Sequence, residues 1–230
     1  SITFDAARNL LFVMGTNGVD ALNATTGALA FSISKAQLAT AAGINVATIG
    51  NGNSVAVSGN NLAMTFDNAT AGAAGFAAVY TINAQGTGAT FRANATVGAV
   101  PDMITFTPDG SRAVVAIEGE PAAGYTTDPA GGLTILNTAT WTPTFVGFGA
   151  FDAQAAALRA SGVKLSNAIP GSPQANQALP SLDLEPEYVA ISPDGNTAYV
   201  TIQENNAIGV FNLQTNAWTA VLPLGLSNHN

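Results

Sequence analysis

The sequence predicts an all-β chain: a β-propeller of four-stranded antiparallel blades, with about four blades present and the ring incomplete. Three observations predict it: a hairpin repeated in the C-terminal half, weaker copies of the same pattern in the N-terminal half, and a composition poor in charge. Of the 230 residues, 47 % are hydrophobic and only 9 % charged, against roughly 25 % charged in ordinary soluble domains. Such a composition favours a globular sheet protein over a disordered chain.

The clearest repeat is a hairpin that occurs twice. Pro101–Glu120, PDMITFTPDGSRAVVAIEGE, aligns without a gap with Pro186–Asn205, PEYVAISPDGNTAYVTIQEN. Each copy begins with proline and a carboxylate, continues as an apolar strand, turns at Pro-Asp-Gly and returns as a second strand. Proline presets φ and glycine accepts a positive φ, so the triplet suits a tight turn.

Both copies continue into two further strands. Residues 132–137, GLTILN, and residues 207–212, AIGVFN, are expected to form the third strands. Trp141 and Trp218 are each expected to open a short fourth strand. Four antiparallel strands in about 40 residues are typical of one propeller blade.

The N-terminal half repeats the pattern more weakly. The predicted blades lie within a single domain at 1–33, 52–97, 100–148 and 185–224. Because propellers commonly close with four to eight blades, an open arc would expose sheet edges. We therefore expect the remaining blades to come from further sequence of the same protein or from a partner chain.

Two short helical insertions are expected between the blades. Residues 34–43 begin with Ser34 and Gln37 at the spacing of a capping box. Residues 151–162 place Phe151 and Leu158 on one helical face. The stretch that follows the second insertion, 166–181, is rich in Pro, Asn and Gln and is expected to be a loop.

Four segments together resemble the choice-of-anchor I propeller domain, a family that includes bacterial proteins labelled mesenchyme-specific cell-surface glycoprotein-like. They are VGAVPDMITFTPDGSRAVVAIEGEP, FDAQAAALRASGVKL, LDLEPEYVAISPDGNTAYVTIQENNAIGVF and LPLGL. The resemblance covers roughly residues 97–228 well and the first half weakly, and it implies an N-terminal part of an exported, often surface-anchored domain. The chain departs from the family pattern at residues 122–124, Ala-Ala-Gly, and at residues 226–228, Leu-Ser-Asn.

The candidate functional site is a group of acidic residues. In a blade the first strand is innermost, and its start opens on the same face as the loop between the second and third strands. Seven carboxylates are expected on that face, and we call them the acidic rim: Asp102, Glu118, Glu120, Asp128, Glu185, Glu187 and Glu204. Asn53 is expected at the equivalent position of the preceding blade, and Tyr125 and Tyr188 are candidate ligand contacts beside the rim.

Crowded carboxylates repel unless a cation or raised pKa values relieve them. Oxygen ligands suit Ca²⁺ or Mg²⁺ better than softer metals. One expectation is therefore a Ca²⁺ site formed by Glu118, Glu120, Glu185 and Glu187. The alternative is that these carboxylates accept backbone hydrogen bonds or are solvated. No organic cofactor is expected.

Charge and residue counts exclude several function classes. With six basic residues against fourteen acidic ones and a net charge of −8, the chain has no basic cluster for nucleic acid. No apolar run reaches the length of a transmembrane segment. There is no cysteine, and the single histidine, His229, lies beside the C-terminus and is expected to be solvated, so a Ser-His-Asp or Cys-His mechanism has no components.

Three functions remain open. The first is an exported or cell-surface binding or scaffold module, with a small ligand or Ca²⁺ at the acidic rim. The second is a metal-dependent hydrolase of phosphoesters, in which the rim would hold the metal that activates water. The third is a structural subunit of a surface assembly, in which open blade edges pair between chains.

Overall fold

The computed structural model describes residues 1–166 and 179–225, and it forms four four-stranded antiparallel sheets. This confirms the prediction of an all-β chain with few helices. Each sheet consists of four consecutive strands that pair in chain order. Neither Leu-Ser-Asn at 226–228 nor His229 lies within the described residues.

The bounds of the strands are as follows. Sheet 1 contains β1 (Ile2–Asp5), β2 (Leu10–Gly15), β3 (Gly18–Asn23) and β4 (Leu29–Ser34). Sheet 2 contains β5 (Ile49–Ser58), β6 (Asn61–Asn68), β7 (Ala74–Ile82) and β8 (Ala89–Ala99). Sheet 3 contains β9 (Pro101–Phe106), β10 (Arg112–Ile117), β11 (Gly132–Asn137) and β12 (Pro143–Gly147). Sheet 4 contains β13 (Tyr188–Ile191), β14 (Thr197–Ile202), β15 (Ala207–Asn212) and β16 (Ala217–Pro223).

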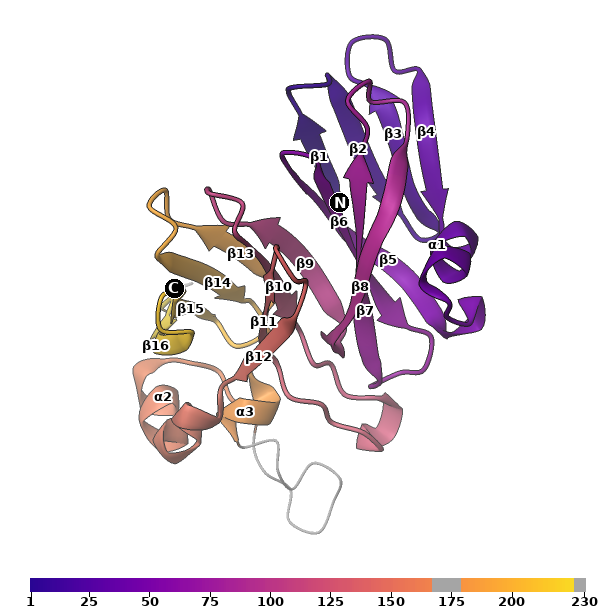
Figure 1. Ribbon diagram of the computed structural model, residues 1–230. Coiled ribbons are helices and arrows are strands. Elements are labelled where there is room, and N and C mark those ends of the chain that lie inside the picture. Colours follow the sequence, from indigo (N-terminus) through magenta and orange to yellow (C-terminus); the bar gives the residue numbers. More distant parts are fainter. Residues whose placement is uncertain (167–178, 226–230) are drawn as a thin grey trace, which may run out of the picture.

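The four sheets follow one another along an arc (Figure 1). Successive sheets meet at their first strands, because β1 contacts β5, β5 contacts β9 and β9 contacts β13. The result is a β-propeller-like arrangement in which the first strand of each sheet is innermost.

Alternating side chains explain why the sheets stack. Along β2 the buried residues are Leu10, Phe12 and Met14, with half-buried residues between them. A strand places alternate side chains on opposite faces, so such a pattern presents one apolar face to a neighbouring sheet. Three hydrophobic clusters result, one at each junction between successive sheets.

The Pro-Asp-Gly turns form as predicted. Gly110 and Gly195 have φ of 69° and 73°, a left-handed conformation that favours glycine. In each turn the aspartate accepts a backbone hydrogen bond from the residue two positions later, 3.0 Å at Asp109 and 3.1 Å at Asp194. The two turns line a common cavity of about 240 Å³, which is separate from the carboxylates of the acidic rim.

The first helical insertion is α1 (Lys35–Ala42), which begins with the predicted capping box of Ser34 and Gln37 and ends at Gly43 in the left-handed conformation. Short 3₁₀ turns lie at η1 (Val46–Thr48) and η2 (Ala123–Tyr125). Within the described residues no helix is both long enough and apolar enough to cross a bilayer.

The second insertion differs from the prediction in its first turn. Residues Gly149–Gln154 form a 3₁₀ helix, η3, and only Ala155–Ser161 form the α-helix, α2. Phe151 and Leu158 are both buried, as their spacing predicts. Most of the stretch expected to be a loop, residues 167–178, lies outside the described residues. Its last two residues begin a short helix, α3 (Pro180–Asp183), whose first turn accommodates Pro180.

The prediction that Trp141 opens the fourth strand of its sheet was wrong. This residue does not open a strand, since β12 begins only at Pro143 and Trp141 itself has a positive φ of 59°. Its ring is buried in the cluster between sheets 2 and 3. Trp218 does lie in β16, where its Nε1 donates a hydrogen bond to the carbonyl of Val146 in sheet 3, 3.1 Å away.

Candidate acidic binding site

The carboxylates of the acidic rim lie at strand ends of sheets 3 and 4. Glu118 directly follows β10, and its backbone N–H donates to the carbonyl of Val100 at 3.0 Å. This bond sets Glu118 beside Asp102, near the start of the paired strand β9. Glu187 directly precedes β13 and is fixed by a backbone hydrogen bond to Thr201, 3.0 Å. The strand registers therefore fix the backbone of three rim residues.

Two glycines allow the loop after β10 to lie close against the segment that precedes β13. A Cβ on Gly131 would lie 2.1 Å from the carbonyl oxygen of Leu184 and 2.9 Å from that of Glu118. Gly119 has φ of 74°, and a Cβ there would lie 2.6 Å from the backbone nitrogen of Gly131. Only glycine fits at these contacts, which bring the strand end that carries Glu118 close to the segment that carries Glu185.

Glu118 is the carboxylate whose pKa is most affected. Burial and the charges of Asp102, Glu120, Glu185 and Glu187 raise its pKa to about 8. Glu120, Glu185 and Glu187, three of the glutamates proposed as Ca²⁺ ligands, therefore lie close enough to the fourth, Glu118, to repel its charge. Burial is the larger cause, since a carboxylate that loses water favours its neutral form.

Glu185 behaves similarly. Burial and then the charges of Glu204, Asp183, Glu120 and Asp128 raise its pKa to about 7. Burial also raises the pKa values of Asp102, Asp128 and Glu187, with further contributions from neighbouring carboxylates. The structure thus brings all seven carboxylates of the rim into one electrostatic group.

A polar cavity of about 150 Å³ lies at one side of this group. It is lined by Tyr125, Lys164, Ser166, Asp183, Glu185, Glu204 and Asn205. Tyr125 therefore lies beside the rim, as expected. Tyr188 does not line the cavity, and its side chain is 60 % exposed at the start of β13.

The cavity contains residues that sequence reasoning missed. Asn205 is buried, accepts a hydrogen bond from the backbone of Glu185 and donates to the carbonyls of Lys164 and Asp183, both at 2.8 Å. Asp183 is 8 % exposed and accepts a hydrogen bond from the backbone of Ser166 at 2.9 Å. The one feature of the sequence that could have identified these two residues is their position: Asn205 directly follows Glu204, and Asp183 lies two residues before Glu185. Lys164 also lines the cavity.

Asn53 lies at the same face in sheet 2. Its side-chain amide donates to Asp67 at 2.7 Å and to the carbonyl of Pro101 at 3.3 Å. Asp67 in turn is one of the charges that raise the pKa of Asp102. Asp67 therefore extends the acidic group into sheet 2, although the sequence had not singled it out.

The positive charge beside the rim comes from Lys164, which lines the cavity, and from Arg159, which acts with it on Asp183. In the part of the chain that the structure describes, the one salt bridge joins Arg8 to Asp5, in sheet 1. Oδ1 of Asp128 is buried without a hydrogen-bond partner. Over residues 1–166 and 179–225, no three acidic or histidine side chains form a preformed metal site.

Solved structures share the fold at low sequence identity. Hydrazine synthase from Kuenenia stuttgartiensis matches with a TM-score of 0.58 and 14 % identity, over 96 % of this chain and 61 % of that chain. A protein from Lactobacillus plantarum matches with a TM-score of 0.57 and 16 % identity, over 96 % of this chain and 56 % of that chain. The chain thus spans about three fifths of these structures. A comparison with curated proteins found no match.

A family model described as the choice-of-anchor I domain matches residues 1–230. The match covers the weak N-terminal repeats as well as the strongly repeated hairpins, and thus extends the resemblance seen in the sequence to the whole chain. The chain belongs to the choice-of-anchor I domain family.

Proposed function

We infer that this domain is a surface-associated binding module that holds a cation, Ca²⁺, at the acidic rim. Membership of the choice-of-anchor I family supports a surface-associated location. The observation that carries the proposal is the convergence of carboxylates from two sheets, with pKa values of about 8 at Glu118 and about 7 at Glu185. Their repulsion opposes folding unless protons or a cation neutralise it.

The chemistry of the rim favours a hard cation. Its side chains offer carboxylate oxygens, and the loop after β10 also carries the carbonyl oxygens of Glu118 and Pro129. Ca²⁺ accepts six to eight oxygen ligands in flexible geometry, so it tolerates ligands that come from separate loops. Binding would draw the side chains of Glu118, Glu120, Glu185 and Glu187 together, and Oδ1 of Asp128 is free to accept a bond.

The test is titration of the chelator-treated protein with CaCl₂ at about pH 8, followed by calorimetry and thermal unfolding. We expect a measurable heat and a rise in the unfolding midpoint, because a ligand that binds only the folded state stabilises it. Glu118→Gln should weaken both effects. Asp20→Asn is the matched control, since Asp20 is exposed in sheet 1 and its bond to Ser32 survives the change. Absence of heat and of a midpoint shift in the wild type would remove the proposal.

The same protein preparation distinguishes a binding module from the alternative, a metal-dependent phosphoesterase. A metal-dependent phosphoesterase would cleave an aryl phosphate in the presence of Ca²⁺ and would lose that activity in Glu187→Gln. A binding module would show the Ca²⁺-dependent midpoint shift without hydrolysis. Both measurements use one preparation, so a failed assay cannot be attributed to misfolding.

A further inference from the structure

A cavity of about 380 Å³ lies at the junction between sheets 1 and 2. It is lined by residues of β4 and β8, the outermost strands of these two sheets, and by helix α1, which contacts both strands. One residue of β7, Tyr80, also lines it. The volume is within the range of small-molecule sites in proteins. We call this space the junction cavity.

The lining of the junction cavity is neutral and partly aromatic. Phe31 of β4 and Phe91 of β8 contribute half-buried rings. Exposed polar side chains come from each side of the cavity: Ser32 and Gln37 from β4 and α1, and Thr90 from β8. None of the described residues that line it is charged. A charged ligand would lose hydration there without gaining an opposite charge, so the cavity fits a neutral ligand.

Tyr80 brings an unused hydrogen-bond donor to this lining. Its side chain is 4 % exposed and belongs to the apolar cluster between sheets 1 and 2, and its hydroxyl is buried without a hydrogen-bond partner. Buried tyrosine hydroxyls usually have a partner, because an unpaired one has lost its water for nothing in return. Burial raises the pKa of Tyr80 to about 12, so the hydroxyl keeps its proton near neutrality and can donate it.

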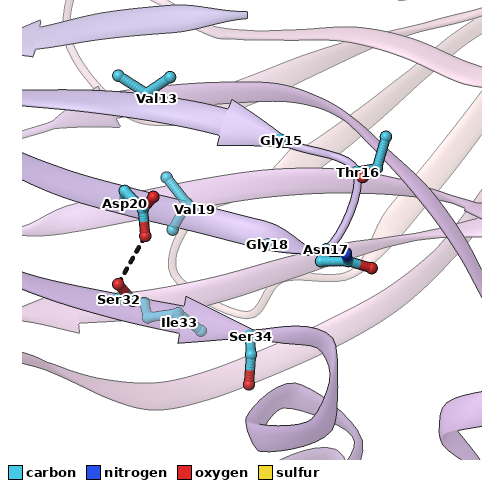
Figure 2. A pocket seen from close by; sticks show the side chains of 10 residues that line it. All are labelled: Val13, Gly15, Thr16, Asn17, Gly18, Val19, Asp20, Ser32, Ile33 and Ser34. Carbon is cyan, nitrogen blue, oxygen red and sulfur yellow. Dashed lines mark hydrogen bonds between the residues drawn. The ribbon is translucent and has the colours of Figure 1, made fainter.

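A slightly larger cavity, of about 400 Å³, lies beside the turn between β2 and β3 (Figure 2). Its charged side chain, Asp20, accepts a hydrogen bond from Ser32 at 2.6 Å. Within the described residues, no buried side-chain atom among those that line it lacks a hydrogen-bond partner. Of these two cavities, the junction cavity is therefore the one that has a buried donor left for a ligand.

We propose that the junction cavity binds the acetamido group of an N-acetylated sugar. This group joins one acceptor oxygen to one methyl group, which match the single donor of Tyr80 and the apolar rings of Phe31 and Phe91. The hydroxyls of the neutral sugar ring can bond to the exposed polar side chains.

Entry of the ligand requires one movement, because the Tyr80 hydroxyl is covered. Phe91 packs edge-on against the Tyr80 ring, with centroids 5.5 Å apart, and is half-buried on the outermost strand. A rotation of Phe91 then gives the acetamido oxygen access to the hydroxyl. The acidic rim lies in sheets 3 and 4, so this inference does not depend on it.

The experiment is saturation-transfer NMR on the 230-residue chain in EDTA, with N-acetylglucosamine, N-acetylgalactosamine and glucose tested separately at millimolar concentration. We expect transfer to the acetyl methyl protons of at least one N-acetylated sugar and none to glucose, which lacks the acetamido group. EDTA removes Ca²⁺, so the result is independent of the acidic rim. Absence of transfer to both N-acetylated sugars overturns the proposal and leaves the hydroxyl to water, and equal transfer to glucose overturns the role of the acetamido group.

Two variants test the position of the site. Tyr80→Phe removes only the hydroxyl and should weaken binding of the N-acetylated sugar about three- to tenfold, measured from the same signal at increasing sugar concentration. It should unfold at the same or a higher urea concentration than the wild type, because it loses an unpaired buried hydroxyl. Ala41→Phe, on the exposed side of α1, should fill the junction cavity and abolish binding, with circular dichroism to check that it is folded.

Tyr199→Phe is the matched control, since Tyr199 is 50 % exposed in sheet 4 and the same atom is removed far from the junction cavity. Its affinity for the sugar should equal that of the wild type. Unchanged affinity in Tyr80→Phe overturns the role of the hydroxyl as the donor. A loss of stability in Tyr80→Phe also contradicts it, because the hydroxyl would then already have a partner within the protein or in bound water.

Discussion

At Glu118 the fold holds a carboxylate in surroundings that favour its neutral form. Its pKa rises from 4.5 to about 8, so between these values the folded chain binds more protons than the unfolded chain. Stability must then fall as the pH rises from about 4.5 through about 8, and it stays lowered above that range. The raised pKa of Glu185 likewise makes stability fall as the pH rises, up to about pH 7.

We therefore expect the midpoint of thermal unfolding to fall between about pH 5 and about pH 8 in the absence of divalent cations. Glu118→Gln should flatten this fall, because an amide has no charge to desolvate. Circular dichroism at several pH values measures both slopes. Identical slopes for the variant and the wild type would contradict the assignment.

Asn205 is a structural residue next to the rim. Its amide holds together the turn after β14, the segment after α2 and the backbone of Glu185. Asn205→Ala leaves buried carbonyls and an N–H without partners, and each such group costs about 1–3 kcal/mol. We expect a loss of about 2–4 kcal/mol in urea unfolding. Gln203→Ala, on the exposed side of the same turn, should change stability by less than about 0.5 kcal/mol.

At the scale of the elements, the stability of helix α1 depends on the hydrogen bonds of its first turn. Ser34 Oγ accepts a hydrogen bond from the backbone of Gln37, while the Gln37 side chain accepts one from the backbone of Ser34 at 2.8 Å. The helix in turn buries Leu38 between sheets 1 and 2. Ser34→Ala should cost about 1 kcal/mol in urea unfolding. Thr40→Ala, within the same exposed helix, should be neutral or slightly stabilising, since alanine is the better helix former.

The elements also show how far sequence can lead. The Pro-Asp-Gly hairpins, α1 and the third strands at 132–137 and 207–212 could be predicted, because turn chemistry, capping and alternation are local. The position of Trp141 could not, since its backbone conformation depends on burial of its ring between two sheets. Asp183 and Asn205 were missed for a similar reason, because their role arises only when segments distant in the sequence meet. Whether the rim binds Ca²⁺ stays a prediction.

At the scale of the whole molecule, stability is distributed over three junctions. Each sheet packs against its neighbours in the chain, as in repeat proteins, whose stability is approximately a sum of local and neighbour terms. Helices η3 and α2 cover the last junction through Phe151 and Leu158. A defect at one junction should therefore loosen two sheets more than the others.

Phe211→Ala tests this distribution. Phe211 is fully buried between sheets 3 and 4 and packs edge-to-face on Trp218. We expect a loss of about 3–5 kcal/mol, with amide hydrogen exchange increasing mainly in β10–β11 and β13–β16. Phe145→Ala is the control, because Phe145 is 44 % exposed and its removal leaves no closed cavity. Equal acceleration of exchange in sheet 1 would argue for a single cooperative unit.

The high pKa values of Glu118 and Glu185 also mean that the proposed binding of a cation at the rim would depend on pH. Near neutrality Glu118 is mostly protonated and Glu185 is about half protonated, so a metal ion that binds their oxygens must release those protons to the medium. The apparent heat of such an exchange would depend on the ionisation enthalpy of the buffer, and the affinity would increase in alkaline surroundings. Mild acidification would then empty the rim without unfolding the sheets.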